Sequence, residues 1–183
     1  IKVPEPTLRE QFDAEMRLID DCAQNRDKSA LARHLKTHNL AQFNSSEFTQ
    51  DKGKLLVKLL KYVIDPLILR KYFVRFPFYI VPMVGGGTPC HYLARRYDYW
   101  PDVWKAKFVQ LYLNDNIEAI DIVDGFRKSI IDSFQCSKIQ HYIARSICLR
   151  KVSHYMWMAL RCPTFILAKV TPNIRRKVLT TYI

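Results

Sequence analysis

The sequence has few glycines, no closely paired cysteines and no long uncharged apolar run. Only 5 of its 183 residues are glycine while 13% are aromatic, a composition typical of long packed elements rather than a loop-rich barrel. None of the five cysteines belongs to a C-x-x-C pair, so a structural zinc site or redox motif has no local support. No stretch of about 18 uncharged apolar residues is present, and we expect no membrane-spanning helix. The nearest approach, residues 63–84, contains four charged residues and three prolines, which favours buried helix and loop over interfacial membrane contact.

Acidic side chains are missing from the last part of the chain. The formal net charge is +12, and residues 1–65 hold 11 basic and 10 acidic side chains, whereas residues 66–183 hold 18 and 7. After Asp132 there is no acid, while nine basic residues remain: Lys138, Arg145, Arg150, Lys151, Arg161, Lys169, Arg175, Arg176 and Lys177. A segment of one sign repels itself unless a polyanion or an acidic partner lies against it. We predict that these nine residues contact the partner; the alternative is a solvated basic face.

The same charge division defines two regions of what we expect to be one continuous domain. Residues 1–65 form an almost neutral N-terminal helical hairpin region, and residues 66–183 form a basic helical region.

The composition also bears on the compartment. Widely spaced cysteines are expected to be reduced thiols, as in the cytosol, the nucleus or the mitochondrial matrix. The sequence starts at Ile1 without a methionine, which is consistent with a processed N-terminus. With the basic charge, these features predict a mitochondrial protein of the matrix or the inner-membrane surface. A cytoplasmic location is the alternative.

The N-terminal residues have the pattern of a helical hairpin. Thr7-Leu-Arg-Glu10 is a capping box, in which the Thr7 oxygen accepts from the Glu10 amide and the carboxylate reaches back. An apolar stripe at helical spacing follows: Leu8, Phe12, Met16 and Ile19. The polar stretch "CAQNRDKSA" ends this pattern, and Asp27 is suited to cap a second helix over residues 31–38. Such hairpins are the units of helical-repeat proteins, and residues 16–35 resemble a pentatricopeptide-type hairpin.

Prolines and glycines divide the rest of the chain. A helix over residues 54–64 is expected to stop at Asp65, because the residue before a proline is pushed out of the helical region. Pro66 then opens the next helix with Asp65 as its cap. "RFPFYIVPMVGGG" predicts an extended, buried Pro/Gly connector around residues 76–89. Further helices are predicted over residues 101–114, 117–131 and 139–159 and from Pro172.

Two local patterns in the glycine-rich segment bear on catalysis. A phosphate loop places its glycines between a strand and a helix and ends in a Lys-Ser or Lys-Thr pair. Here Gly85-Gly86-Gly87 runs into a Thr-Pro pair, and the next lysine is Lys105, so nucleotide binding is not favoured. Cys90 and His91 are adjacent, and neighbouring residues at a helix start point in different directions. A small buried cysteine beside a capping histidine is therefore favoured over a nucleophile and its base.

Other titratable residues give no better case. His34 and His38 have the i, i+4 spacing of two metal ligands on one helix, but no glutamate follows the first histidine and no acidic third ligand is near in sequence. They are interpreted as paired surface histidines. Glu118, Asp121 and Asp124 recur every three residues, which predicts an acidic helix face that is solvated or paired. No catalytic, cofactor-binding or metal-binding residue is assigned.

The segment 86–115 resembles an ankyrin repeat. Five residues of "GGTPCHYLAR" stand where the family motif Gly-x-Thr-Pro-Leu-His-x-Ala-Ala has them: Gly86, Thr88, Pro89, His91 and Ala94. The resemblance implies that a short helix begins at the Thr-Pro pair, that the His91 side chain bonds back to the Thr turn, and that "KFVQLYLND" forms the second helix. Residues 97–104 would be an insertion, and Cys90 and Leu93 replace the usual Leu and Ala.

These features favour a mainly α-helical protein, either an irregular helical bundle or a short stack of helical hairpins. Because no chemical groups converge in the sequence, we predict that it is not an enzyme and needs no cofactor. The first hypothesis is a basic structural or assembly subunit of a large mitochondrial complex, such as the ribosome or an inner-membrane respiratory or ATP synthase complex. Its partners would be other subunits, RNA, or an anionic lipid such as cardiolipin. The alternative is an ankyrin-like or helical-repeat protein–protein adaptor.

Overall fold

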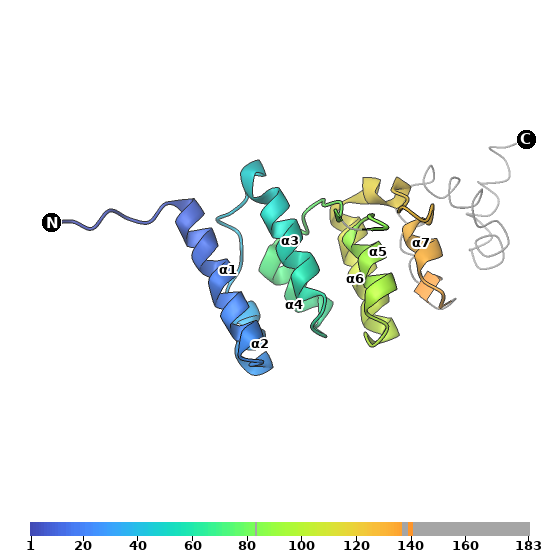
Figure 1. Cartoon of the computed structure of the whole chain (residues 1–183), viewed down its shortest axis with the longest axis horizontal. Coiled ribbons are helices and arrows are strands. Elements are labelled where there is room, and N and C mark those ends of the chain that lie inside the picture. Colours follow the sequence, from blue (N-terminus) through green and yellow to red (C-terminus); the bar gives the residue numbers. More distant parts are fainter. Residues whose placement is uncertain (83, 137–138, 141–183) are drawn as a thin grey trace, which may run out of the picture. The chain divides into compact units, whose positions relative to one another are not determined.

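The computed structural model describes residues 1–82, 84–136 and 139–140, and this part of the chain is mainly α-helical without a strand, as the sequence predicts (Figure 1). It divides into two compact units, Ile1–Ile80 and Val81–Ile183, which are described separately. This division falls after Ile80, whereas the change in charge falls after Asp65, because the first unit also packs the basic helix that follows Pro66. No helix in the described residues has both the length and the apolar character needed to cross a bilayer.

The first helical hairpin forms as predicted from its caps. Helix α1, Leu8–Gln24, begins with the Thr7–Glu10 capping box, in which the Glu10 carboxylate accepts the Thr7 N–H at 2.8 Å. Helix α2, Lys28–Thr37, begins after Asp27, whose carboxylate accepts the Ala30 N–H at 2.9 Å. The two helices lie side by side (Figure 1).

The apolar stripe of α1 is only partly buried. Phe12 and Ile19 are buried, whereas Leu8 is 46% exposed. Phe12 packs on the rings of Phe43 and Phe48, with centroids 5.1 and 5.2 Å away, so the residues between α2 and α3 supply part of this core.

The second hairpin consists of α3, Thr49–Leu59, preceded by a short 3₁₀ helix η1, Ser46–Phe48, and α4, Pro66–Phe73. The predicted bounds of the first helix are wrong at both ends. It starts at Thr49, before the predicted start at Lys54. It ends at Leu59, where the Tyr62 N–H bonds to the Leu59 carbonyl and closes the chain into a turn. The predicted start of α4 is confirmed, because Asp65 accepts the Leu67 N–H at 2.9 Å.

The connector after α4 is extended, as predicted, but its burial alternates. In the first unit Pro77 and Tyr79 are buried, whereas Phe78 and Ile80 are each 44% exposed. Alternation is the pattern of an extended backbone with one covered side. The connector ends in the second unit, where the Val81 N–H donates to the Gly87 carbonyl at 2.8 Å.

The second unit is built on α5, Pro89–Arg96, and α6, Asp102–Asp115, which pack against each other. A 3₁₀ helix η2, Ile117–Asp121, and the short α7, Ile130–Ser133, follow. The predicted helix over residues 117–131 is therefore wrong: between η2 and α7 the chain forms a turn, with Arg127 at φ 59°. The helices predicted over 139–159 and from Pro172 lie outside the described residues, apart from two positions at the start of the first.

Candidate functional site

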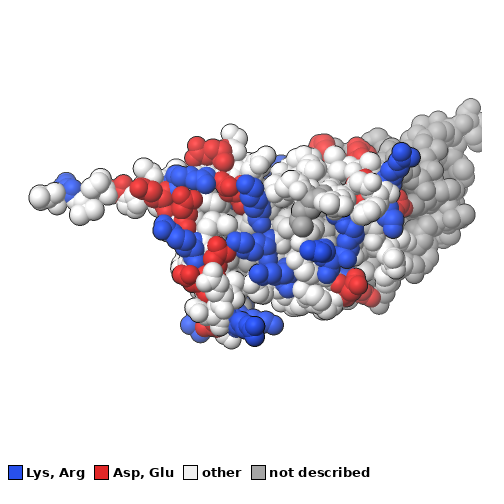
Figure 2. Space-filling view, in the orientation of Figure 1, with Lys and Arg blue, Asp and Glu red and all other residues white. Residues whose placement is uncertain are grey.

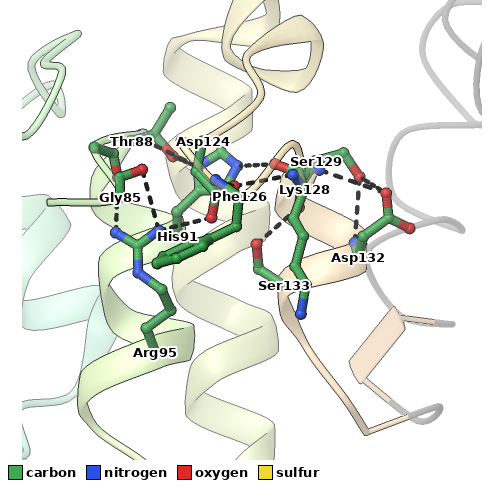
Figure 3. Close-up of polar contacts among 11 residues, drawn as sticks. Gly85, Thr88, His91, Arg95, Asp124, Phe126, Lys128, Ser129, Asp132 and Ser133 are labelled. Carbon is green, nitrogen blue, oxygen red and sulfur yellow. Dashed lines mark hydrogen bonds and ion pairs between the residues drawn. The ribbon is translucent and has the colours of Figure 1, made fainter.

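The Thr-Pro segment at the start of α5 forms the hydrogen bond implied by its sequence. Nδ1 of His91 accepts the Thr88 N–H at 3.0 Å and lies 2.9 Å from the Thr88 hydroxyl, and both side chains are fully buried (Figure 3). Because Nδ1 is an acceptor, the proton of the neutral ring is on Nε2. The histidine therefore caps its own helix.

The opposite edge of the same ring reaches the loop before α7. Nε2 of His91 donates to the Lys128 carbonyl oxygen at 3.0 Å. Burial lowers the pKa of His91, against the opposing influence of this bond and of the Asp124 charge. The imidazole is thus held neutral with both nitrogens in use.

Asp124 organises that loop. Its carboxylate accepts the N–H groups of Phe126 and Lys128, both at 2.9 Å, and receives Nη1 of Arg95 at 2.7 Å. Burial opposes ionisation here, but the two backbone donors, His91 and Arg95 together keep the pKa of Asp124 below its usual value. Burial without partners would raise the pKa of a carboxyl group. Asp124 instead forms an ion pair with Arg95 and remains a carboxylate.

Arg95 connects the two loops. Its Nη2 donates to the Gly86 carbonyl at 2.7 Å, and its guanidinium lies 5.7 Å from the centre of the Phe126 ring. Beside it the Gly125 N–H donates to the Gly85 carbonyl at 2.5 Å. A Cβ on Gly85, whose φ is 92°, would meet the Phe126 ring, so only glycine fits there. We call the group Thr88, His91, Arg95, Asp124 and Lys128 the loop clasp.

A second helix start repeats the cap of the first. The Ser129 hydroxyl donates to the Asp132 carboxylate at 2.7 Å, and the Asp132 N–H donates back to the hydroxyl at 3.2 Å (Figure 3). Each cap residue follows a residue of positive φ by two positions: Gly86, with φ 47°, precedes Thr88, and Arg127, with φ 59°, precedes Ser129. This second cap was not predicted from the sequence. The signal is present as Ser-x-x-Asp, but it was assigned to a helix interior.

The contacts of the clasp disfavour both functions considered for this segment, nucleophilic catalysis by Cys90 and phosphate binding by the glycine loop. Burial raises the pKa of the Cys90 thiol, and the adjacent histidine uses both its nitrogens elsewhere, so the pair does not form a nucleophile and base. The glycine loop directs two of its carbonyl oxygens, those of Gly85 and Gly86, at Arg95. A phosphate site requires N–H groups in that position.

The histidines of α2 are not a surface pair. His34 is only 9% exposed, its Nε2 lies 2.5 Å from a carboxylate oxygen of Glu15 on α1, and the Tyr72 hydroxyl donates to the same oxygen at 2.7 Å. His38 is exposed and stacks on His34 with ring centroids 4.2 Å apart. The tertiary fold thus brings in an acid that was absent from the local sequence. Among the described residues, no group of three side chains is arranged to hold a metal ion.

The predicted acidic helix face does not form. Glu118 and Asp121 are exposed on η2, while Asp124 is buried in the clasp. The reason is that the chain leaves the helical path after η2, so the spacing of three no longer places the carboxylates on one side.

All nine basic residues predicted to contact the partner lie outside the described residues: Lys138, Arg145, Arg150, Lys151, Arg161, Lys169, Arg175, Arg176 and Lys177. In the first unit, acidic and basic side chains are interspersed around α1 on the face drawn in Figure 2. Arg9 pairs with Asp51 at 2.6 Å and Lys58 with Asp20 at 2.5 Å, which fits the near-neutral charge of residues 1–65.

Comparison with protein-family models, with curated proteins and with solved structures gives no match. The ankyrin and pentatricopeptide resemblances therefore depend on the residues and contacts described above.

Proposed function

We propose that this chain is a non-catalytic, ankyrin-like helical-repeat protein that binds other proteins, as an adaptor or as a subunit of a larger assembly. The observation that carries the proposal is the bond from His91 to the Lys128 carbonyl, together with the second capped helix start at Ser129. In repeat proteins each unit contacts its neighbours and is stabilised by them. A histidine that caps α5 and also holds the loop before α7 is a connection of this kind.

The polar groups of the loop clasp bond to one another, and this supports a binding role over catalysis. In the loop clasp, every nitrogen of His91 and both oxygens of Asp124 have partners within the protein. A satisfied buried network makes a segment rigid. Rigid loops with exposed apolar tips are suited to recognition.

The exposed side chains at the clasp agree with a protein partner. Val84 is 97% exposed and Phe126 59% exposed, on the two loops that the clasp joins. Aromatic residues and arginine are enriched in the buried centres of protein interfaces. Phe126, stacked on Arg95, presents this combination.

We further propose, on the sequence alone, that the acid-free segment after Asp132 contacts acidic neighbouring subunits, RNA or an anionic lipid. A mitochondrial location remains part of this proposal. It follows from the basic charge and from cysteines that are free where the structure describes them: Cys22, Cys90 and Cys136.

The test is co-purification from native material with cross-linking and identification of the bound protein. The double variant Val84→Ser, Phe126→Ser should lose the partner, while Val103→Ser, which removes a 65% exposed valine from α6, should retain it. Equal recovery with all three proteins, and cross-links that avoid Lys128, would contradict binding at the clasp.

A further inference from the structure

The second unit contains a cavity of about 510 Å³ beside the loop clasp. It is lined from α5, α6, the Asp124 turn and the residues around α7, and its charged and aromatic lining includes Arg95, Asp98, Asp102, Lys105, Phe126 and Lys128. Volumes of this size accommodate small ligands or single peptide side chains. Arg95 and Lys128 of the loop clasp border this space, whereas Thr88, His91 and Asp124 do not.

Lys105 is the unusual group in the cavity. The residue is only 7% exposed, and its ammonium group donates to the Asp98 carbonyl oxygen at 3.2 Å. An ammonium has three donors, and within the described part of the chain no carboxylate lies at ion-pair distance from this one. Burying an ammonium without a counter-charge is costly. The cavity therefore favours an anion at Lys105.

The remaining charges limit what that anion can be. Lys128 adds a second cation to the lining, whereas the guanidinium of Arg95 is occupied by Asp124. Asp98 and Asp102 also line the cavity and would repel a chain of phosphates. A single carboxylate flanked by apolar groups fits better, because Phe126 and the other apolar side chains of the lining can cover it.

The chain itself is a poor source of that carboxylate. It contains no aspartate or glutamate after Asp132. A second protein, as required by the function proposed above, supplies acidic side chains freely.

We propose that this cavity binds an aspartate or glutamate side chain of a partner protein, with Lys105 as the principal contact. The inference depends on the proposed protein-binding function and adds the chemistry that the partner must present: one acidic residue within an apolar segment.

The probe is an N-acetylated, C-amidated peptide Ala-Phe-Glu-Phe-Ala, compared with its Gln analogue. Binding is followed by the ¹³Cε resonances of lysine in the full chain. We expect a saturable shift of Lys105 with the Glu peptide and about tenfold or more weaker binding of the Gln peptide, the usual effect of a hydrogen bond between charged groups. Inorganic phosphate and polyuridylate are the competing ligands. Tighter binding of either, equal binding of the two peptides, or no shift up to millimolar peptide would overturn the proposal.

Two variants of the protein complete the test. Lys105→Met should lose about tenfold or more in affinity for the Glu peptide, whereas Lys107→Met, on the same helix and outside the cavity lining, should not. The melting temperature of Lys105→Met should stay unchanged or rise; a clear decrease would indicate that Lys105 is mainly structural, through its bond to the Asp98 carbonyl, and would overturn the assignment.

If Lys105→Met fails to fold, Asp102→Asn decides the question. Removing this carboxylate should tighten the Glu peptide by about threefold or more, since a repelling charge leaves the cavity. Unchanged or weaker binding would contradict the proposal. If the wild-type protein recovers its partner through Val84 and Phe126 but does not bind the Glu peptide, only the cavity proposal is refuted. If the wild-type protein binds the Glu peptide but the Val84→Ser, Phe126→Ser variant recovers the partner equally well, only the proposed adaptor surface is refuted.

Discussion

Nε2 of His91 lies 3.0 Å from the carbonyl oxygen of Lys128, so the residue that caps α5 also holds the loop that leads into α7. One neutral imidazole accepts a bond on one side and donates on the other. The capping of one helix and the position of the next loop are therefore coupled through a single protonation state.

This coupling predicts a dependence of stability on pH. Burial lowers the pKa of folded His91, so the unfolded chain takes up the proton at a higher pH than the folded chain does. The contribution of His91 to the free energy of unfolding should be fully present above about pH 6.5 and should decrease as the pH falls below that value. Urea denaturation between about pH 8 and pH 5 would measure it. His91→Gln should be less stable and should lack this part of the pH dependence; identical pH profiles for the two proteins would refute the role of His91.

The carboxylate of Asp124 should be among the most important side chains of the second unit. Asp124→Ala leaves two backbone N–H groups and Arg95 without their acceptor, and we expect a loss of about 2–4 kcal/mol in the free energy of unfolding. Asp121→Ala, an exposed acid on η2, is the matched control and should change it by less than about 0.5 kcal/mol. Chemical denaturation of both variants gives the comparison, and similar losses would show that the clasp contributes little.

Gly53 should resist replacement by alanine despite lying inside α3. A Cβ at this position would overlap the ring of Tyr79 in the connector. Alanine usually stabilises an exposed helix by about 1 kcal/mol relative to glycine. Here we expect the opposite, a loss of about 1–3 kcal/mol from overpacking. Adding Tyr79→Ala should make the combined loss smaller than the sum of the two single losses, as measured by a double-mutant cycle; strict additivity would mean that the two residues do not meet.

Asp65 should be required as a cap. Its carboxylate accepts the Leu67 N–H, so Asp65→Ala should lower the free energy of unfolding by about 0.5–2 kcal/mol. Asp65→Asn keeps an acceptor of nearly equal capping preference and should retain most of it. Thermal and urea denaturation of the three proteins provide the test, with equal losses for Ala and Asn counting against a capping role.

The acid-free segment gives a prediction about the partner. Replacing Arg175, Arg176 and Lys177 together by Gln should reduce the slope of log affinity for RNA against log salt by about 2 to 3, if each contacts a phosphate. If the partner is an anionic lipid, the same change should weaken binding to cardiolipin vesicles and leave neutral vesicles unaffected. The control replaces three exposed basic residues of α2 by Gln: Lys28, Arg33 and Lys36. Full retention of binding to RNA, anionic vesicles and the native assembly would identify the segment as a solvated face.

Helix starts were predictable from sequence because capping is a short-range relation. The starts of α1 and α4 each depend on residues at most three positions apart, and both form as expected: Thr7 with Glu10, and Asp65 with Pro66. Helix ends and lengths were less predictable. The prediction of a helix over residues 117–131 was wrong although the spacing is compatible with one. Asp124 forms a turn with the Phe126 and Lys128 N–H groups, and Arg95 and His91, far along the sequence, hold that turn in place.

The amino-acid sequence by itself determined the helical class, the extended connector and the Thr88–His91 cap, since each follows from periodicity, proline and glycine placement, or contact between near neighbours. Only the tertiary structure decided what these pieces do together. Glu15 meets His34 across two helices, and Asp124 is buried beside His91 because side chains from separate segments satisfy one another's charges and hydrogen bonds. Such pairings have no fixed spacing along the chain, so they emerge only when the helices pack.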